Sequence, residues 1–261
     1  MSGLVQYTHR GPAAVLAINR PEKRNALSRA LIAALTDAFL RAANDAGARC
    51  VILTGTGPAF CAGMDLDELR GTLGPDGDKV WDDAGRLSAL YELIYTLPKP
   101  TIAAVNGPAV AGGAGLVTVC DLAVSVPDAK FGYPEVRRGL VAAMVLPHLL
   151  RLVGERTARW LLLSGELVDG ITALRFGLVN QVTAAENLLA TADAWVRSLC
   201  EGGPQALATT KDLLRRCSRQ AVATDELAKA SAEPRLTDEC RHGLAAFFDK
   251  KPAPWLPAGE S

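Results

Sequence analysis

The chain has 261 residues, which is enough for one large domain or for one domain with a small addition. Lysine and arginine number 28 and balance 28 aspartates and glutamates, so the formal net charge is zero. This balance argues against a protein that binds nucleic acid or a membrane surface, because both need a strongly basic field. No segment reaches the roughly 20 apolar residues that cross a bilayer, and no signal peptide is recognised, so we expect a cytoplasmic protein.

The cysteines and histidines show no spacing typical of a metal site. The six cysteines stand in apolar or helical contexts without a CxxC pattern, which predicts reduced thiols in a cytosolic protein. They are Cys50, Cys61, Cys120, Cys200, Cys217 and Cys240. The three histidines are scattered along the chain. We therefore expect no bound metal.

The first half of the chain alternates between predicted strands and helices. Two short runs, 4–10 and 13–20, predict a hairpin, and Ser28 is placed to cap an amphipathic helix that runs to about Ala46. Residues 71–83 are polar and glycine-rich, which predicts a mobile surface loop. Further strands are expected at 49–55, 101–107 and 120–126, and further helices at 64–70 and about 85–95. Nearly continuous apolar strands between helices indicate an α/β fold with a largely parallel sheet.

After Leu140 the pattern becomes helical almost throughout, with the last strong helical stretch at 237–251. We divide the chain into an α/β core, 1–195, and a helical C-terminal region, 196–261.

Two stretches, 51–66 and 101–116, share one construction: an apolar strand, a turn of small residues and then a helix. In the second, Gly112, Gly113 and Gly115 crowd together where the helix begins. The start of a helix leaves backbone N–H groups free and favours negative charge. Two such turns could supply an oxyanion hole. The alternative, that the glycines only permit close packing of helix and strand, has similar weight on these grounds.

Four ordered blocks carry a family resemblance: "NRPEKRNALS" (19–28), "GPAFCAGMDLDEL" (57–69), "NGPAVAGGAGLVTVCDLAV" (106–124) and "FGYPEVRRGL" (131–140). Together they resemble the crotonase superfamily, the enoyl-CoA hydratases and isomerases, over essentially the whole chain. The resemblance implies a spiral of ββα turns, with core and acyl-CoA site in residues 1–195 and a helical trimerisation region in residues 196–261. It also implies a homotrimer, or a hexamer made of two trimers.

The resemblance assigns the two oxyanion amides to Met64 and Gly112, and the catalytic acid/base to Glu135. A partly buried carboxyl group at Glu135 would have a raised pKa, which suits proton transfer near neutral pH. The alternative is a solvated loop acid that pairs with Arg137 or Arg138.

One position departs from the family's two-glutamate hydratases, because Gly115 stands where the first glutamate is expected. Glu135 alone could hydrate a 2-enoyl-CoA to a 3-hydroxyacyl-CoA, which we favour. It could instead move the double bond of a 3-enoyl-CoA to position 2, and a non-catalytic acyl-CoA-binding protein is a third alternative. Residues 139–150 lack a glycine-rich pattern common in straight-chain hydratases and predict a bulkier pocket wall.

Coenzyme A enters these expectations as part of the substrate, so no separate cofactor is expected. The resemblance places Lys23 and Arg24 near the phosphates and adenine. Phe247 and Lys250 are expected to reach the CoA of a neighbouring subunit. Ala62, Asp65 and Leu66 complete the expected CoA-binding residues, with Asp65 and Leu66 lining the adenine pocket through their backbone.

Overall fold

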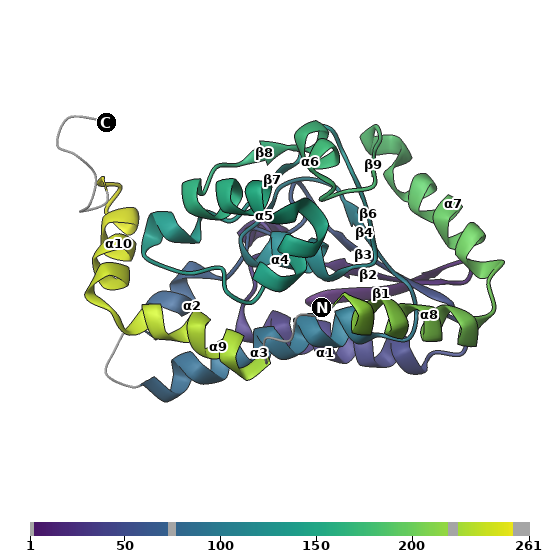
Figure 1. The fold of residues 1–261 in the computed structure, drawn as a ribbon, viewed down its shortest axis with the longest axis horizontal. Helices are drawn as coiled ribbons and strands as arrows, with labels where there is room; N and C mark the ends of the chain where they lie inside the picture. Colours follow the sequence, from purple (N-terminus) through teal and green to yellow (C-terminus); the bar gives the residue numbers. More distant parts are fainter. Residues whose placement is uncertain (1–2, 73–76, 219–223, 253–261) are drawn as a thin grey trace.

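A six-stranded sheet forms the centre of the protein (Figure 1), in a computed structural model that describes residues 3–72, 77–218 and 224–252. The strand order is β1-β2-β3-β4-β6-β9; β1 and β2 are antiparallel, and the remaining neighbours are parallel. A second, three-stranded sheet has the order β5-β7-β8.

The strands are β1 (Val5–Arg10), β2 (Ala13–Ile18), β3 (Cys50–Gly55), β4 (Thr101–Val105), β5 (Ala109–Val110), β6 (Leu122–Ser125), β7 (Lys130–Gly132), β8 (Val168–Asp169) and β9 (Gln181–Val182). The α-helices are α1 (Arg29–Asn44), α2 (Leu66–Arg70), α3 (Gly77–Thr96), α4 (Gly112–Val119), α5 (Leu146–Ser164), α6 (Gly170–Phe176), α7 (Leu188–Cys200), α8 (Pro204–Cys217), α9 (Thr224–Ala232) and α10 (Asp238–Phe248). Short 3₁₀ helices are η1 (Pro21–Lys23), η2 (Pro134–Arg138), η3 (Ala185–Asn187) and η4 (Glu233–Leu236).

The predicted α/β class is confirmed, and most predicted elements appear where their sequence signals placed them. The Ser28 side chain accepts a hydrogen bond from the Leu31 N–H at 3.1 Å, which satisfies one free donor at the start of α1. Strands β3 and β4 are buried along almost their whole length, because helices cover both faces of this part of the sheet. The predicted boundary at residue 195 stays a prediction, and it falls inside α7.

The predicted mobile loop at 71–83 is wrong for 77–83, which form the first turns of α3; residues 73–76 lie outside the described residues. Val80 and Ala84 are buried and pack with Ala232 of α9 in a small apolar cluster. Figure 1 shows α9 beside α3. The helix forms because a distant segment buries its apolar side, a contact that local composition does not reveal.

One backbone contact joins the two small-residue turns. Cys61 N–H donates to the Pro108 carbonyl at 3.1 Å, and Val110 N–H donates to the Cys61 carbonyl at 3.0 Å. This isolated parallel bridge places the segment before α2 beside the start of α4. No helix within the described ranges is long and apolar enough to span a membrane.

We expect Gly113→Ala to destabilise the fold strongly, because a Cβ at Gly113 would lie 2.1 Å from the Cys61 carbonyl oxygen. The loss in the free energy of unfolding should be about 3 kcal/mol or more, the upper range for overpacking. The control is Gly85→Ala in α3, where a Cβ meets nothing within 4 Å, and where the change should stabilise by about 0.5–1 kcal/mol. Urea denaturation of both variants measures the difference, and equal stabilities would contradict the tight contact.

Candidate active site

A pocket of about 120 Å³ lies where the two turns meet α3, η2 and the α9–η4 segment. Most of its wall is apolar and comes from α2, α3 and the chain between η2 and α5. Its polar side chains are Tyr91, Glu135, Arg138, Ser231 and Arg235. An apolar pocket with a few convergent polar groups is the usual form of a small-molecule site.

The first turn leaves the Met64 amide without a hydrogen-bond partner. Leu27 N–H donates to the Gly63 carbonyl at 2.7 Å, and Asp65 N–H donates to the Leu27 carbonyl at 2.9 Å. Leu27 therefore binds the residues on both sides of Met64. Within the described chain, no hydrogen bond uses the Met64 N–H itself.

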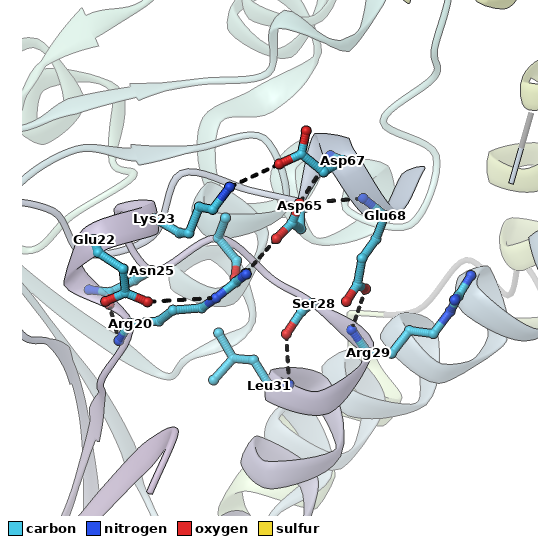
Figure 2. A network of polar contacts seen from close by, with 11 residues as sticks. Arg20, Glu22, Lys23, Asn25, Ser28, Arg29, Leu31, Asp65, Asp67 and Glu68 are labelled. Atoms are coloured by element: carbon cyan, nitrogen blue, oxygen red, sulfur yellow. Dashed lines mark hydrogen bonds and ion pairs between the residues drawn. The ribbon is translucent and has the colours of Figure 1, made fainter. Parts of the chain in front are cut away.

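A polar network holds this turn in place (Figure 2). The buried Asp65 carboxylate accepts hydrogen bonds from the backbone at the start of α2 and pairs with Arg20 at 2.5 Å. These contacts keep the pKa of Asp65 below its usual range although burial acts to raise it. Glu68 of α2 accepts a hydrogen bond from the Arg29 N–H at 2.8 Å, which ties α2 to the start of α1.

The second turn contains an unusual backbone conformation at Ala111. Its φ of 53° and ψ of −125° lie outside the regions that alanine normally adopts. Ala111 N–H donates to the Gly132 carbonyl at 2.8 Å, which anchors the turn to β7. The next amide, that of Gly112, starts α4 and donates to no acceptor among the described residues.

The two free amides belong to segments in close contact. A Cβ built on Gly63, the residue before Met64, would lie 3.3 Å from the Gly112 nitrogen and 2.9 Å from the Val110 carbonyl oxygen. Gly63 also has φ +91°, a conformation that favours glycine. Because neither amide has an acceptor among the described residues, both remain available to a bound ligand.

Glu135 lines the pocket and is half-buried. Its Oε2 atom is buried and has no hydrogen-bond partner within the described part of the chain. Burial raises the pKa of Glu135 to about 7, although its own backbone N–H and the nearby Arg138 act in the opposite direction. A group with this pKa takes up and releases protons near neutral pH.

Tyr91 of α3, which the sequence analysis did not single out, fills the space beside Gly115. A Cβ at Gly115 would lie 2.2 Å from the Tyr91 Oη atom and 2.7 Å from Val145. The buried Tyr91 hydroxyl donates to the Gly112 carbonyl at 2.7 Å, and burial holds its pKa well above the usual value. A neutral hydroxyl therefore occupies the space that a side chain at position 115 would enter, the position where the resemblance expects a glutamate.

The predicted site residues separate into two groups. Those that line the pocket are Ala62, Met64, Leu66, Gly112 and Glu135. Those that do not are Lys23, Arg24, Asp65, Phe247 and Lys250. Lys23 is exposed and pairs with Asp67 at 2.9 Å, whereas Phe247 lies under Arg138 of the same chain at 4.4 Å.

Arg138 and Arg235 also line the pocket, and the sequence analysis did not predict either as a site residue. Arg138 lies one turn after Glu135, and the sequence indicated it only as a possible ion-pair partner of a solvated Glu135. Arg235 lies about 100 positions further along the chain in a helical segment, where no local motif marks it. Among the described residues, no group of three or more histidines, cysteines, aspartates or glutamates is arranged to hold a metal ion.

Comparison with known proteins shows the family of this chain. The family model described as enoyl-CoA hydratase/isomerase matches residues 10–257. The chain belongs to the enoyl-CoA hydratase/isomerase family. The recognition of a crotonase-type protein from the four sequence blocks is thereby confirmed.

Individual members of the enoyl-CoA hydratase/isomerase family match this chain over most of their own length. A Thermus thermophilus protein whose name provisionally describes an enoyl-CoA hydratase is 41% identical over 93% of this chain and 97% of its own. The mevalonyl-coenzyme A hydratase sidH of Aspergillus fumigatus is 33% identical over 94% of this chain and 91% of its own. The solved structure of an enoyl-CoA hydratase from Mycobacterium avium has a TM-score of 0.85 and 35% identity, and covers 98% of this chain and 100% of that chain.

We expect Glu135→Gln to stabilise the folded protein above neutral pH. In the unfolded chain the carboxyl group ionises above its usual pKa of about 4.3, whereas in the folded protein burial raises this pKa to about 7. Stability is therefore lost as the pH rises from about 4.3 to 7, and the loss is complete above that pH. The gain from the neutral glutamine should approach about 3 kcal/mol at pH 8 and shrink as the pH falls toward 4.5. Urea denaturation at several pH values measures it, and a pH-independent difference would contradict the raised pKa.

The contact between Gly115 and Tyr91 should appear as coupling between two substitutions. We expect Gly115→Ala to lower the free energy of unfolding by about 2 kcal/mol, because its Cβ overlaps the tyrosine ring and hydroxyl. In a Tyr91→Leu background the same change should cost at least about 0.5 kcal/mol less. A double-mutant cycle by urea denaturation measures the coupling, and strictly additive costs would show that Tyr91 does not occupy this space.

Proposed function

We propose that the protein hydrates a 2-enoyl-CoA to a 3-hydroxyacyl-CoA, with Glu135 as the acid/base. The observation that carries the proposal is a carboxyl group with one buried oxygen in the same pocket as two backbone amides, all three without a hydrogen-bond partner among the described residues. A thioester carbonyl supplies the acceptor that both amides lack. A water molecule supplies the hydrogen-bond partner that Glu135 lacks.

The reaction requires the thioester oxygen to accept hydrogen bonds from the Met64 and Gly112 N–H groups. Ionised Glu135 removes a proton from water as the water oxygen bonds to C3. The C2–C3 π electrons move toward the thioester, and the resulting enolate charge is stabilised by the two amides. Glu135 then returns the proton to C2, so that one carboxyl group performs both transfers and is regenerated.

The names of the relatives favour hydration. The curated relatives are mostly named as hydratases, and one of them is named as acting on mevalonyl-CoA, an oxygen-bearing branched acyl group. The pocket wall contains Leu140, Val141, Met144 and Val145, which agrees with the bulkier wall predicted from 139–150. We propose a substrate whose acyl group differs from a short straight chain.

A second reaction, migration of the double bond from position 3 to position 2, is favoured by one specific observation. Tyr91 fills the space beside Gly115, the position where the resemblance expects the second carboxylate of a hydratase. A lone acid/base needs no water to move a proton from C2 to C4 of a 3-enoyl-CoA. The non-catalytic alternative also rests on the Gly115 departure, but it does not explain a buried carboxyl group with a pKa near 7.

Binding of the CoA portion and the assembly of subunits remain proposals. Lys23 and Arg24 of the η1 region are exposed and near α2, which suits contact with CoA phosphates. We propose a cytoplasmic homotrimer or hexamer. In either assembly Phe247 and Lys250, both exposed, would be able to approach a neighbouring CoA.

We expect purified protein to remove the enoyl absorbance of a 2-enoyl-CoA. Glu135→Gln should lower kcat by about 10²–10⁴-fold while leaving CoA affinity nearly unchanged, because general acid/base catalysis is lost. Absorbance that appears from a 3-enoyl-CoA would identify the isomerase instead. Binding of both thioesters without any change in either would identify the non-catalytic alternative.

The pH profile tests the role of Glu135 independently. Since its ionised form accepts the proton from water, kcat/KM should rise with pH through about 7 and then level off. Steady-state rates from pH 5 to 9 measure the midpoint. A flat profile, or a midpoint near the usual glutamate value of about 4.3, would remove Glu135 from this role.

A further inference from the structure

The pocket that contains Glu135 also contains a buried positive charge that the proposed reaction does not use. Arg235 is only 4% exposed and lines the pocket. Its Nη1 atom is buried and has no hydrogen-bond partner in the described chain. A buried guanidinium with an unused N–H is costly unless a ligand satisfies it.

The carboxylate near Arg235 is already occupied. Asp83 of α3 accepts two hydrogen bonds from the Arg29 guanidinium, at 2.5 and 2.8 Å. Its field acts to raise the pKa of Arg235, but burial has the larger effect and lowers it. The Asp83 carboxylate therefore pairs with the Arg29 guanidinium. The positive charge of Arg235 is only partly balanced by the more distant field of Asp83.

The second arginine of the pocket is better satisfied than the first. Arg138 faces the charge of Glu135 and lies over the Phe247 ring at 4.4 Å. It also donates to the Pro134 carbonyl at 3.3 Å. Its Nε atom is buried and has no hydrogen-bond partner among the described residues. The balance of charge in the pocket is thus two guanidinium groups against one carboxyl group that is partly protonated at neutral pH.

We propose that the acyl group of the substrate carries a carboxylate, and that Arg235 binds it. A purely hydrocarbon acyl chain would surround the Arg235 guanidinium with apolar atoms and leave its Nη1 atom without a hydrogen-bond partner, which is unfavourable. A carboxylate provides the planar pair of acceptors that a guanidinium matches best. Ser231 adds a buried side chain to the same wall. The substrate class is then the CoA monothioesters of unsaturated dicarboxylic acids, a conclusion that rests on the proposed function.

A CoA phosphate is the other source of an anion for Arg235. The exposed basic residues proposed for the CoA phosphates, Lys23 and Arg24, lie beside α2. Arg235 instead follows α9, which packs on α3. This placement favours the acyl end of the ligand.

The test compares matched thioesters that differ only in the terminal group. Glutaconyl-CoA and 2-pentenoyl-CoA have five-carbon acyl groups, and six- and seven-carbon pairs extend the series. We expect kcat/KM to be about 10- to 100-fold higher for the carboxylated member of at least one pair, the range for a charge-assisted hydrogen bond. Equal values throughout the series would overturn the proposal.

Substitutions assign the preference to Arg235. Arg235→Met should reduce the ratio of the two kcat/KM values at least 10-fold, whereas Arg235→Lys, which keeps the charge, should retain part of it. Arg137→Met is the matched control, because Arg137 is exposed, donates to the Ser164 carbonyl at 2.9 Å and does not line the pocket. An unchanged ratio in the Arg235→Met protein would show that another group binds the carboxylate.

Binding measurements separate this proposal from the proposed reaction. Calorimetry with glutaryl-CoA, pentanoyl-CoA and free CoA needs no turnover. Tighter binding of glutaryl-CoA that Arg235→Met abolishes supports the carboxylate site even if no enoyl-CoA is hydrated. If Arg235→Met weakens free CoA by the same factor, the anion is a CoA phosphate and the carboxyacyl proposal fails.

Discussion

The pair of hydrogen bonds that joins Cys61 to the Pro108–Val110 segment is the contact on which the site depends. It brings together two turns that are about 50 residues apart in the sequence. Gly113 permits this approach, because any side chain there would meet the Cys61 carbonyl. With the turns joined, the Met64 and Gly112 amides lie in adjacent segments and neither has an internal acceptor. The glycines thus permit the close packing of the two turns, and this packing places the two unbonded amides in adjacent segments. The two interpretations of the glycines, close packing and an oxyanion hole, are therefore compatible.

Several costly features gather around this one pocket. Ala111 adopts a backbone conformation that is unfavourable for a residue with a side chain. Buried polar atoms of Glu135, Arg138 and Arg235 have no partner in the part of the chain that the structure describes. Each feature lowers stability on its own by an amount on the order of 1–3 kcal/mol. They persist because the surrounding sheets and helices determine the backbone around them. Their concentration in a single place is the pattern expected where a ligand completes the interactions.

Local signals in the sequence were sufficient for β1 to β4, β6, the capped helix α1 and the two turns. They missed the short strands β5, β7, β8 and β9, which have only two or three residues each. They failed at residues 77–83, because the helix there depends on burial against α9. The family resemblance located Met64, Gly112 and Glu135, and the geometry brings them to one pocket, although their roles stay predictions. It could not locate Tyr91 or Arg235, because neither belongs to a motif. The space beside Gly115 and the partner missing from Arg235 are properties of packing between distant segments, so no local pattern encodes them.

The charges of the pocket connect the reaction to the substrate. Without ligand, Glu135 faces desolvation and the nearby Arg138, and the balance leaves its pKa near 7. A carboxylate bound to Arg235 would bring the pocket to two positive and two negative charges once Glu135 ionises. Neutrality is then reached only with the base in its active form and the correct acyl group in place. An apolar acyl chain would leave the buried Arg235 guanidinium unpaired, so that discrimination between substrates would arise from the charge of this one side chain.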